Sequence, residues 1–179
     1  MKLIPCMITI GNFICGLLAI YSLLFHDIYA AAIFIFVGML FDFFDGMVAR
    51  KLNAVSDIGK ELDSFADLIT FGVAPSILAY NVALHSLSYI GILCTLTFGI
   101  CGMIRLSRFN IHQSDSPTFI GMPIPLAGIL LVLLSFMSSN NSIVLALATC
   151  GLSYLMVSKV KFPHFKKLTV ENPEARGWE

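Results

Sequence analysis

The chain has 179 residues, of which 58% are hydrophobic and 12% are charged, and its basic and acidic residues balance at eleven each. Soluble domains carry about 25% charged residues, so this composition excludes an ordinary soluble protein and predicts a single integral membrane domain. The zero net charge gives no sign of a nucleic-acid-binding surface. The five cysteines are scattered through apolar segments without metal-ligand spacing, so we interpret them as small buried hydrophobic residues.

Six segments are apolar enough to form transmembrane helices, which need about 20 mostly apolar residues. The first is interpreted as an uncleaved helix rather than a signal peptide, because it continues to about Phe25 without a clear small-residue cleavage site. We therefore predict an all-α integral membrane fold with a six-helix bundle in residues 1–160 and a polar cytosolic tail in residues 161–179. The predicted segments are 3–25, 30–50, 61–84, 87–108, 122–138 and 141–160.

The basic residues predict the orientation in the membrane. With six spans, every lysine and arginine lies on the same side, and the joints on the other side have none. Loops rich in lysine and arginine face the cytosol. We therefore expect a multi-pass protein of the cell membrane with both termini in the cytosol.

Four aspartates stand at helical spacing in the second and third segments. Asp42 and Asp45 are three residues apart, and Asp63 and Asp67 are four apart, so each pair shares a helix face. If the two helices run antiparallel, both pairs meet at one end, near the cytosolic headgroups. Converging carboxylates repel one another unless cations lie between them, and carboxylate oxygens suit hard divalent metals. The pattern predicts a site for hard divalent metals with oxygen ligands.

Small and basic residues accompany the aspartates. Gly46 and Gly59 permit close approach of a ligand, and Arg50 can make a charge-assisted contact with a phosphate. Metals bridge carboxylates to phosphate oxygens. At headgroup depth, this combination indicates a phosphate-bearing lipid substrate.

The pattern D-x-x-D-G-x-x-A-R, followed after eight residues by G-x-x-x-D-x-x-x-D, resembles the signature of CDP-alcohol phosphotransferases. Six membrane spans with the signature across the second and third are what this family shows. Every fixed position of the signature is present. These positions are Asp42, Asp45, Gly46, Ala49, Arg50, Gly59, Asp63 and Asp67.

Three further stretches are similar to the phosphatidylserine synthases of this family: residues 9–16, residues 71–75, and residues 105–110 with 121–125. The resemblance implies transfer of the phosphatidyl group from CDP-diacylglycerol to L-serine, with release of CMP. It also implies two Mg²⁺ or Mn²⁺ ions and a homodimer. Cys6 is a departure, because relatives often have asparagine there after the proline.

The resemblance also implies roles for residues. One metal would be held by Asp42, Asp45 and Asp63, and a second by Asp42, Asp63 and Asp67. Asp67 would be the general base that takes the serine hydroxyl proton. Residues expected to contact the CDP-lipid are Thr9, Asn12, Gly46, Ala49, Arg50 and Gly59.

Arg105 and Arg108 lie three residues apart at the cytosolic end of the fourth segment. They are candidates for holding the carboxylate of serine or the lipid phosphate. The alternative is that they only anchor the helix end on the cytosolic side.

Other functions stay open. The same chemistry with glycerol 3-phosphate or inositol phosphate as acceptor would favour a denser basic pocket. An intramembrane prenyltransferase would also use aspartate-bound magnesium, but the D-G-x-x-A-R element argues against it. A cation transporter would place carboxylates near the bilayer centre, often within internal repeats. Here the carboxylates lie near one surface and no repeat is apparent.

Overall fold

The computed structural model describes residues 3–51, 57–112 and 121–158, excluding the side chains of residues 3–5, 49–51, 57 and 112. This part of the chain forms helices and turns and contains no strand, which confirms the predicted all-α class. The helices are α1 (Leu3–Leu24), α2 (Ile28–Lys51), α3 (Asp57–Asp67), the π-helix η1 (Leu68–Val73), α4 (Ala74–Val82), the 3₁₀-helix η2 (Leu84–Leu87), α5 (Tyr89–His112), α6 (Ile124–Met137) and α7 (Ser142–Val157).

Within the described part of the chain, four stretches are long and apolar enough to cross a membrane: Cys6–Leu24, Ile28–Val48, Ile58–Val82 and Tyr89–Ile111. The helices of the other two predicted segments are also apolar but shorter, with 14 residues in α6 and 16 in α7. The protein is therefore a multi-span membrane protein, and the count of six spans stays a prediction. The predicted tail lies outside the described residues.

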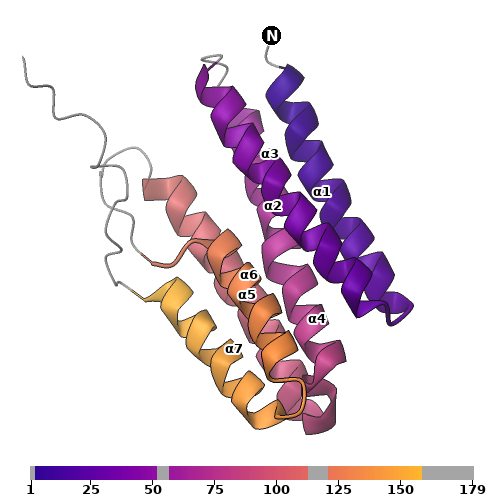
Figure 1. Cartoon of the computed structure of the whole chain (residues 1–179). Helices are drawn as coiled ribbons and strands as arrows, with labels where there is room; N and C mark the ends of the chain where they lie inside the picture. The colour runs from indigo at the N-terminus through magenta and orange to yellow at the C-terminus, as the bar shows by residue number, and fades with distance from the viewer. Residues whose placement is uncertain (1–2, 52–56, 113–120, 159–179) are drawn as a thin grey trace, which may run out of the picture.

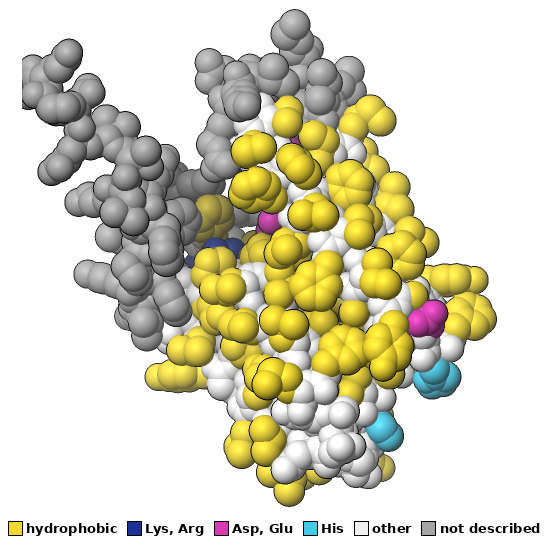
Figure 2. Space-filling view, viewed as in Figure 1, with side chains coloured by type: hydrophobic (Ala, Val, Ile, Leu, Met, Phe, Trp, Pro, Cys, Tyr) yellow, Lys and Arg dark blue, Asp and Glu magenta, His cyan; other side chains and the backbone are white. Residues whose placement is uncertain are grey.

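The helices pack side by side as an elongated bundle (Figure 1). Helix α1 packs along α2, and α3 and η1 pack against α1, while α4 contacts α6 and α5 contacts α7. The start of α1, the end of α2 and the start of α3 lie at the same end of the bundle (Figure 1). Apolar side chains cover much of the described part of the face shown in Figure 2, as expected for a surface in contact with lipid. The antiparallel course of α2 and α3 brings the two halves of the signature together.

The third predicted segment is a helix whose middle widens into the π-helix η1. Pro75 has no N–H, and its ring would clash with the carbonyl of Phe71 four residues earlier in a regular α-helix. The N–H of Ala74 instead donates to the carbonyl of Ile69, five residues back. The predicted span over residues 61–84 thus corresponds to the continuous helical stretch Ile58–Val82, and the proline marks where this helix widens.

Close packing at η1 depends on a glycine of α6. A Cβ built on Gly128 would lie 2.4 Å from the carbonyl oxygen of Phe71 and 3.0 Å from its Cα. Phe71 is fully buried, so its backbone cannot move outward into lipid. Membrane helices often associate through small residues that let backbones approach in this way.

We expect Gly128→Ala to lower the free energy of unfolding by about 1–3 kcal/mol, because the new methyl group overpacks the contact between α6 and η1. Thermal unfolding in detergent measures the change. Gly151→Ala in α7 is the matched control, because its Cβ would meet nothing within 4 Å. Alanine is the better helix former, so this control should be neutral or slightly stabilising. Equal effects of the two substitutions would contradict the packing role.

Candidate metal centre

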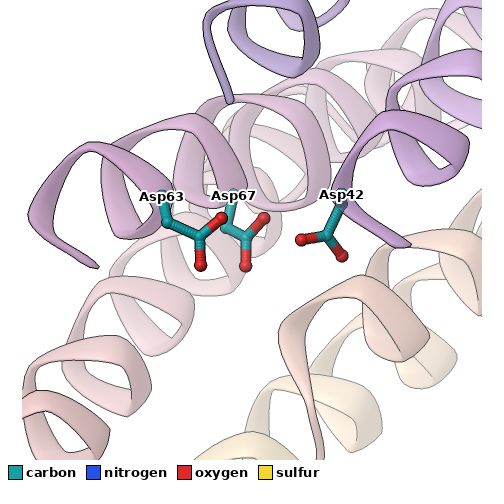
Figure 3. A group of neighbouring side chains, drawn as sticks. All are labelled: Asp42, Asp63 and Asp67. Atoms are coloured by element: carbon teal, nitrogen blue, oxygen red, sulfur yellow. The ribbon is translucent and has the colours of Figure 1, made fainter. Parts of the chain in front are cut away.

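Three carboxylates converge at the end of the bundle. Asp42 comes from α2, and Asp63 and Asp67 come from α3, one helical turn apart. One oxygen of each lies within 4.8 Å of one oxygen of each of the others. Figure 3 shows the three side chains pointing into the same space between the helices. For these three residues, the predicted meeting of the two halves of the signature is confirmed.

The charges of this cluster fit a divalent cation. Asp42 and Asp63 are half-buried and Asp67 is 8% exposed, so water screens their mutual repulsion only partly. The charge of Arg105 on α5 offsets part of the charge of Asp67. Carboxylate oxygens are the ligands that hard divalent cations prefer. The residues present therefore fit a divalent metal, as the sequence predicted.

Asp45 lies outside the group of three. Its Oδ2 accepts a hydrogen bond from the hydroxyl of Thr9 on α1. Its charge still acts on Asp42 and Asp63, so it adds to the negative potential of the site. Because Asp45 follows Asp42 by three residues, the two project from α2 in somewhat different directions, and Asp45 meets α1. Convergence of all four aspartates was expected, and the structure brings three together.

Asn12 of α1 reaches the other half of the signature. Its Nδ2 donates to Oδ1 of Asp67 over 3.4 Å, and its backbone carbonyl accepts a hydrogen bond of 3.1 Å from the hydroxyl of Thr70. Asn12 is completely buried. The residues predicted to contact the CDP-lipid from the first helix therefore lie at the aspartate site, and both bind aspartates.

The two arginines of α5 have different surroundings. Arg105 is half-buried, interacts with the charge of Asp67, and lies with its Cζ 5.2 Å from the centroid of the Phe109 ring. Arg108 is exposed, and its Nη1 donates to the carbonyl of Val157 over 2.9 Å. That carbonyl is in the last turn of α7, where the helix leaves acceptors unpaired. The charge of Arg105 thus acts on the aspartate cluster, and Arg108 ties α5 to α7.

The remaining predicted contacts lie along the signature. Gly46 follows Asp45 in α2, and Gly59 lies one turn before Asp63 in α3. The side chains of Ala49 and Arg50 lie outside the described residues. Their predicted roles stay predictions.

One connection at the site was not anticipated. The side chain of Asn110 on α5 donates to the hydroxyl of Ser64 over 3.0 Å, and to Oε1 of Glu61 over 3.5 Å. Ser64 immediately follows Asp63, so this contact ties α3 to α5 beside the carboxylate cluster. The only signal in the sequence was a polar residue at the end of an apolar segment, which does not identify its partner.

Comparison with known proteins agrees with this geometry. Residues 2–157 match the CDP-alcohol phosphatidyltransferase family, so the match covers most of the chain and the whole aspartate site. The chain belongs to this family. Its resemblance to the family signature is thereby confirmed, and the family's use of divalent metal agrees with the aspartate cluster.

Similar members of the family carry related names. A protein of Bacillus subtilis named CDP-diacylglycerol–serine O-phosphatidyltransferase is 72% identical over 99% of both chains. A protein of the same name from Methanocaldococcus jannaschii is 39% identical, with 88% of this chain and 72% of its own length covered. An archaetidylserine synthase of Methanothermobacter thermautotrophicus is 35% identical, with 89% of this chain and 69% of its own length covered.

Proposed function

We propose that the protein is a CDP-diacylglycerol–serine O-phosphatidyltransferase, which transfers the phosphatidyl group to the hydroxyl of L-serine and releases CMP. The observation that carries the proposal is the convergence of Asp42, Asp63 and Asp67 at one end of a membrane bundle. It is supported by 72% identity over nearly the full length to a protein with that name. The enzyme is therefore a transferase of phospholipid synthesis.

The reaction makes one P–O bond and breaks another. The serine hydroxyl oxygen attacks the phosphorus attached to diacylglycerol, and the bond from this phosphorus to the oxygen of CMP breaks. Asp67 takes the hydroxyl proton, because a free alcohol is a poor nucleophile near neutral pH. Arg50 offsets the charge that develops on CMP. The family resemblance assigns these two roles, and the position of Asp67 in the carboxylate cluster supports the first.

The carboxylates of Asp42, Asp63 and Asp67, with Asp45 beside them, are proposed to hold two divalent ions, Mg²⁺ or Mn²⁺. When bound, the ions would neutralise the diphosphate and the leaving phosphate. Contacts to the CDP-lipid are proposed for Gly46, Ala49 and Gly59. With the basic residues facing inward, the site and both termini lie on the cytosolic side of the inner, or cytoplasmic, membrane. A homodimer is implied by the family resemblance alone.

CMP release by purified protein in detergent tests the proposal. CDP-diacylglycerol and Mg²⁺ or Mn²⁺ are supplied, and serine, glycerol 3-phosphate and inositol phosphate are offered separately as acceptors. We expect release with serine alone. CMP release with one of the phosphorylated acceptors would still support the metal site, but it would overturn serine as the acceptor. No release with any acceptor, together with transport of a divalent ion by reconstituted protein, would favour the transporter.

Arg105 is proposed to hold the carboxylate of serine, because it lies at the aspartate site. Arg105→Ala should raise the KM for serine by about 10–100-fold, the loss expected for one charge-assisted hydrogen bond. The KM for CDP-diacylglycerol should stay within about twofold. Arg108→Ala is the matched control, because Arg108 contacts the end of α7 instead. A KM for serine that Arg105→Ala leaves unchanged would contradict this role. A raised KM for CDP-diacylglycerol would assign Arg105 to the lipid phosphate.

A further inference from the structure

Helix α1 carries no carboxylate, yet it contacts both halves of the aspartate signature. Thr9 and Asn12 are three residues apart on one face of this otherwise apolar helix. Both are buried, with 3% and 0% of their surface exposed. The hydroxyl of Thr9 donates to Asp45 on α2, and the carboxamide of Asn12 donates to Asp67 on α3. One face of α1 therefore supplies one hydrogen-bond donor to each half.

The carboxamide of Asn12 has one unpaired atom. Among the described residues, its Oδ1 is buried and has no hydrogen-bond partner. Burying an acceptor without a partner costs free energy, and such groups are uncommon in native structures. Turning the carboxamide over would place Oδ1 against the carboxylate of Asp67, where two acceptors repel. In the present orientation, the carboxylate of Asp67 therefore gains a hydrogen-bond donor, while Oδ1 of Asn12 is left without one.

The surroundings of Asn12 hold this orientation. Thr70, one turn after Asp67, donates to the backbone carbonyl of Asn12. A Cβ built on Gly38 of α2 would lie 3.0 Å from Oδ1 of Asn12 and 2.6 Å from Cγ2 of Thr70. The glycine thus leaves the space that the carboxamide oxygen and the threonine methyl group occupy. Thr70 from the helix that carries Asp67 and Gly38 from the helix that carries Asp45 thus restrict the orientation of the Asn12 side chain.

We propose that Thr9 and Asn12 are positioning residues: Asn12 orients the carboxylate of Asp67 for metal binding and proton transfer, and Thr9 fixes the carboxylate of Asp45 beside the cluster. The kinetic part of this inference rests on the proposed function. Each donor engages one carboxylate oxygen, and in Asp67 this leaves the other oxygen for a cation or a hydroxyl proton. Partners that orient ligating side chains generally affect metal affinity and activity by about 10–100-fold when they are removed. This role differs from direct contact with the CDP-lipid, which the sequence predicted for both residues.

Mn²⁺ affinity, measured by electron paramagnetic resonance of free Mn²⁺ without substrate, tests this role in purified full-length protein. Thr9→Val keeps the side-chain shape and removes the donor, and Asn12→Ala removes the carboxamide. Each should weaken Mn²⁺ binding and lower kcat by about 10-fold or more. The KM for CDP-diacylglycerol should stay within about twofold. Thr9→Ser retains a hydroxyl and should recover most of the affinity.

Two matched controls remove the same groups elsewhere. Thr149 is buried, and its hydroxyl donates to the carbonyl of Leu145 in its own helix. Asn81 donates its carboxamide to Ile77 within α4. Thr149→Val and Asn81→Ala should leave Mn²⁺ affinity unchanged. If they weaken it as much as the α1 variants do, the effect is one of folding and the proposal is wrong.

The outcomes separate this inference from the proposed function. Unchanged Mn²⁺ affinity with a raised KM for CDP-diacylglycerol would overturn the positioning role and make both residues lipid contacts. If Asn12→Ala does not fold, the Mn²⁺ affinity of Thr9→Val still tests the positioning role, because this isosteric substitution creates no cavity. Wild-type protein that binds Mn²⁺ but releases no CMP with serine would refute the proposed function. The Mn²⁺ affinities of the variants would then still support or overturn the orientation of the aspartates.

Discussion

Asp67→Asn is expected to lower CMP release with serine by about 1,000-fold or more, within the range that general-base catalysis contributes. Asparagine has nearly the same size as aspartate, but its carboxamide cannot take the hydroxyl proton and supplies no charge to a cation. Asp67 is buried beside Asp42 and Asp63, so water cannot readily replace the lost carboxylate. The measurement is kcat for CMP release at saturating CDP-diacylglycerol, serine and Mg²⁺.

Asp27→Asn is the matched control for this substitution. Oδ1 of Asp27 accepts a hydrogen bond of 3.0 Å from the backbone N–H of Ala30 at the start of α2, at the other end of that helix from Asp42. Asparagine caps helices about as well as aspartate does, so activity and stability should be unchanged. Activity of Asp67→Asn within tenfold of wild type would contradict its assignment as the base.

Removal of divalent metal should lower CMP release by about as much as Asp67→Asn does. With a chelator present, CMP release should fall to background, because the carboxylates of Asp42, Asp63 and Asp67 repel the substrate diphosphate unless cations lie between them. Added Mg²⁺ or Mn²⁺ should restore it. Metal at 100 times its Kd should also stabilise the fold by about 2.7 kcal/mol. Thermal unfolding with and without metal measures this stabilisation independently of activity.

The double variant Asp42→Asn with Asp63→Asn should lose the metal-dependent stabilisation. Without metal it should be more stable than the wild type, because two of three mutually repelling charges are gone. Glu61→Gln is the matched control, since Glu61 lies on α3 near Asp63 but outside the carboxylate group. Full activity after chelation, or the same metal-dependent shift in the double variant, would rule out a metal centre at these residues.

Much of the site follows from local patterns in the chain. Apolar segments separated by polar joints predict membrane helices, because the backbone must pair its own polar groups in lipid. The spacing of Asp42 with Asp45, and of Asp63 with Asp67, places each pair on a helix face. A short connection between two such helices brings both pairs to the same end. The family and its metal chemistry were therefore apparent before any tertiary contact was known.

Contacts between distant helices could not be read from those patterns. Helical spacing tells which residues share a face, but the rotation of each helix about its axis depends on how all neighbouring side chains pack. That rotation turns Asp45 toward Thr9 and separates it from the other three aspartates. It also determines that the charge of Arg105 acts on Asp67, while Arg108 donates a hydrogen bond at the end of α7.

Asn12 most clearly shows the difference between what the sequence predicts and what tertiary packing decides. An asparagine in an apolar helix predicts a polar site, and its position relative to Thr9 predicts a shared face. Its partner was decided by three-dimensional packing, in which Gly38 leaves room for its oxygen and Thr70 holds its backbone. The residue types of the chain determine the chemistry available to the protein. The packing of α1 against α2 and α3 determines which donor meets which carboxylate, because hydrogen bonds form only between groups brought within about 3.5 Å.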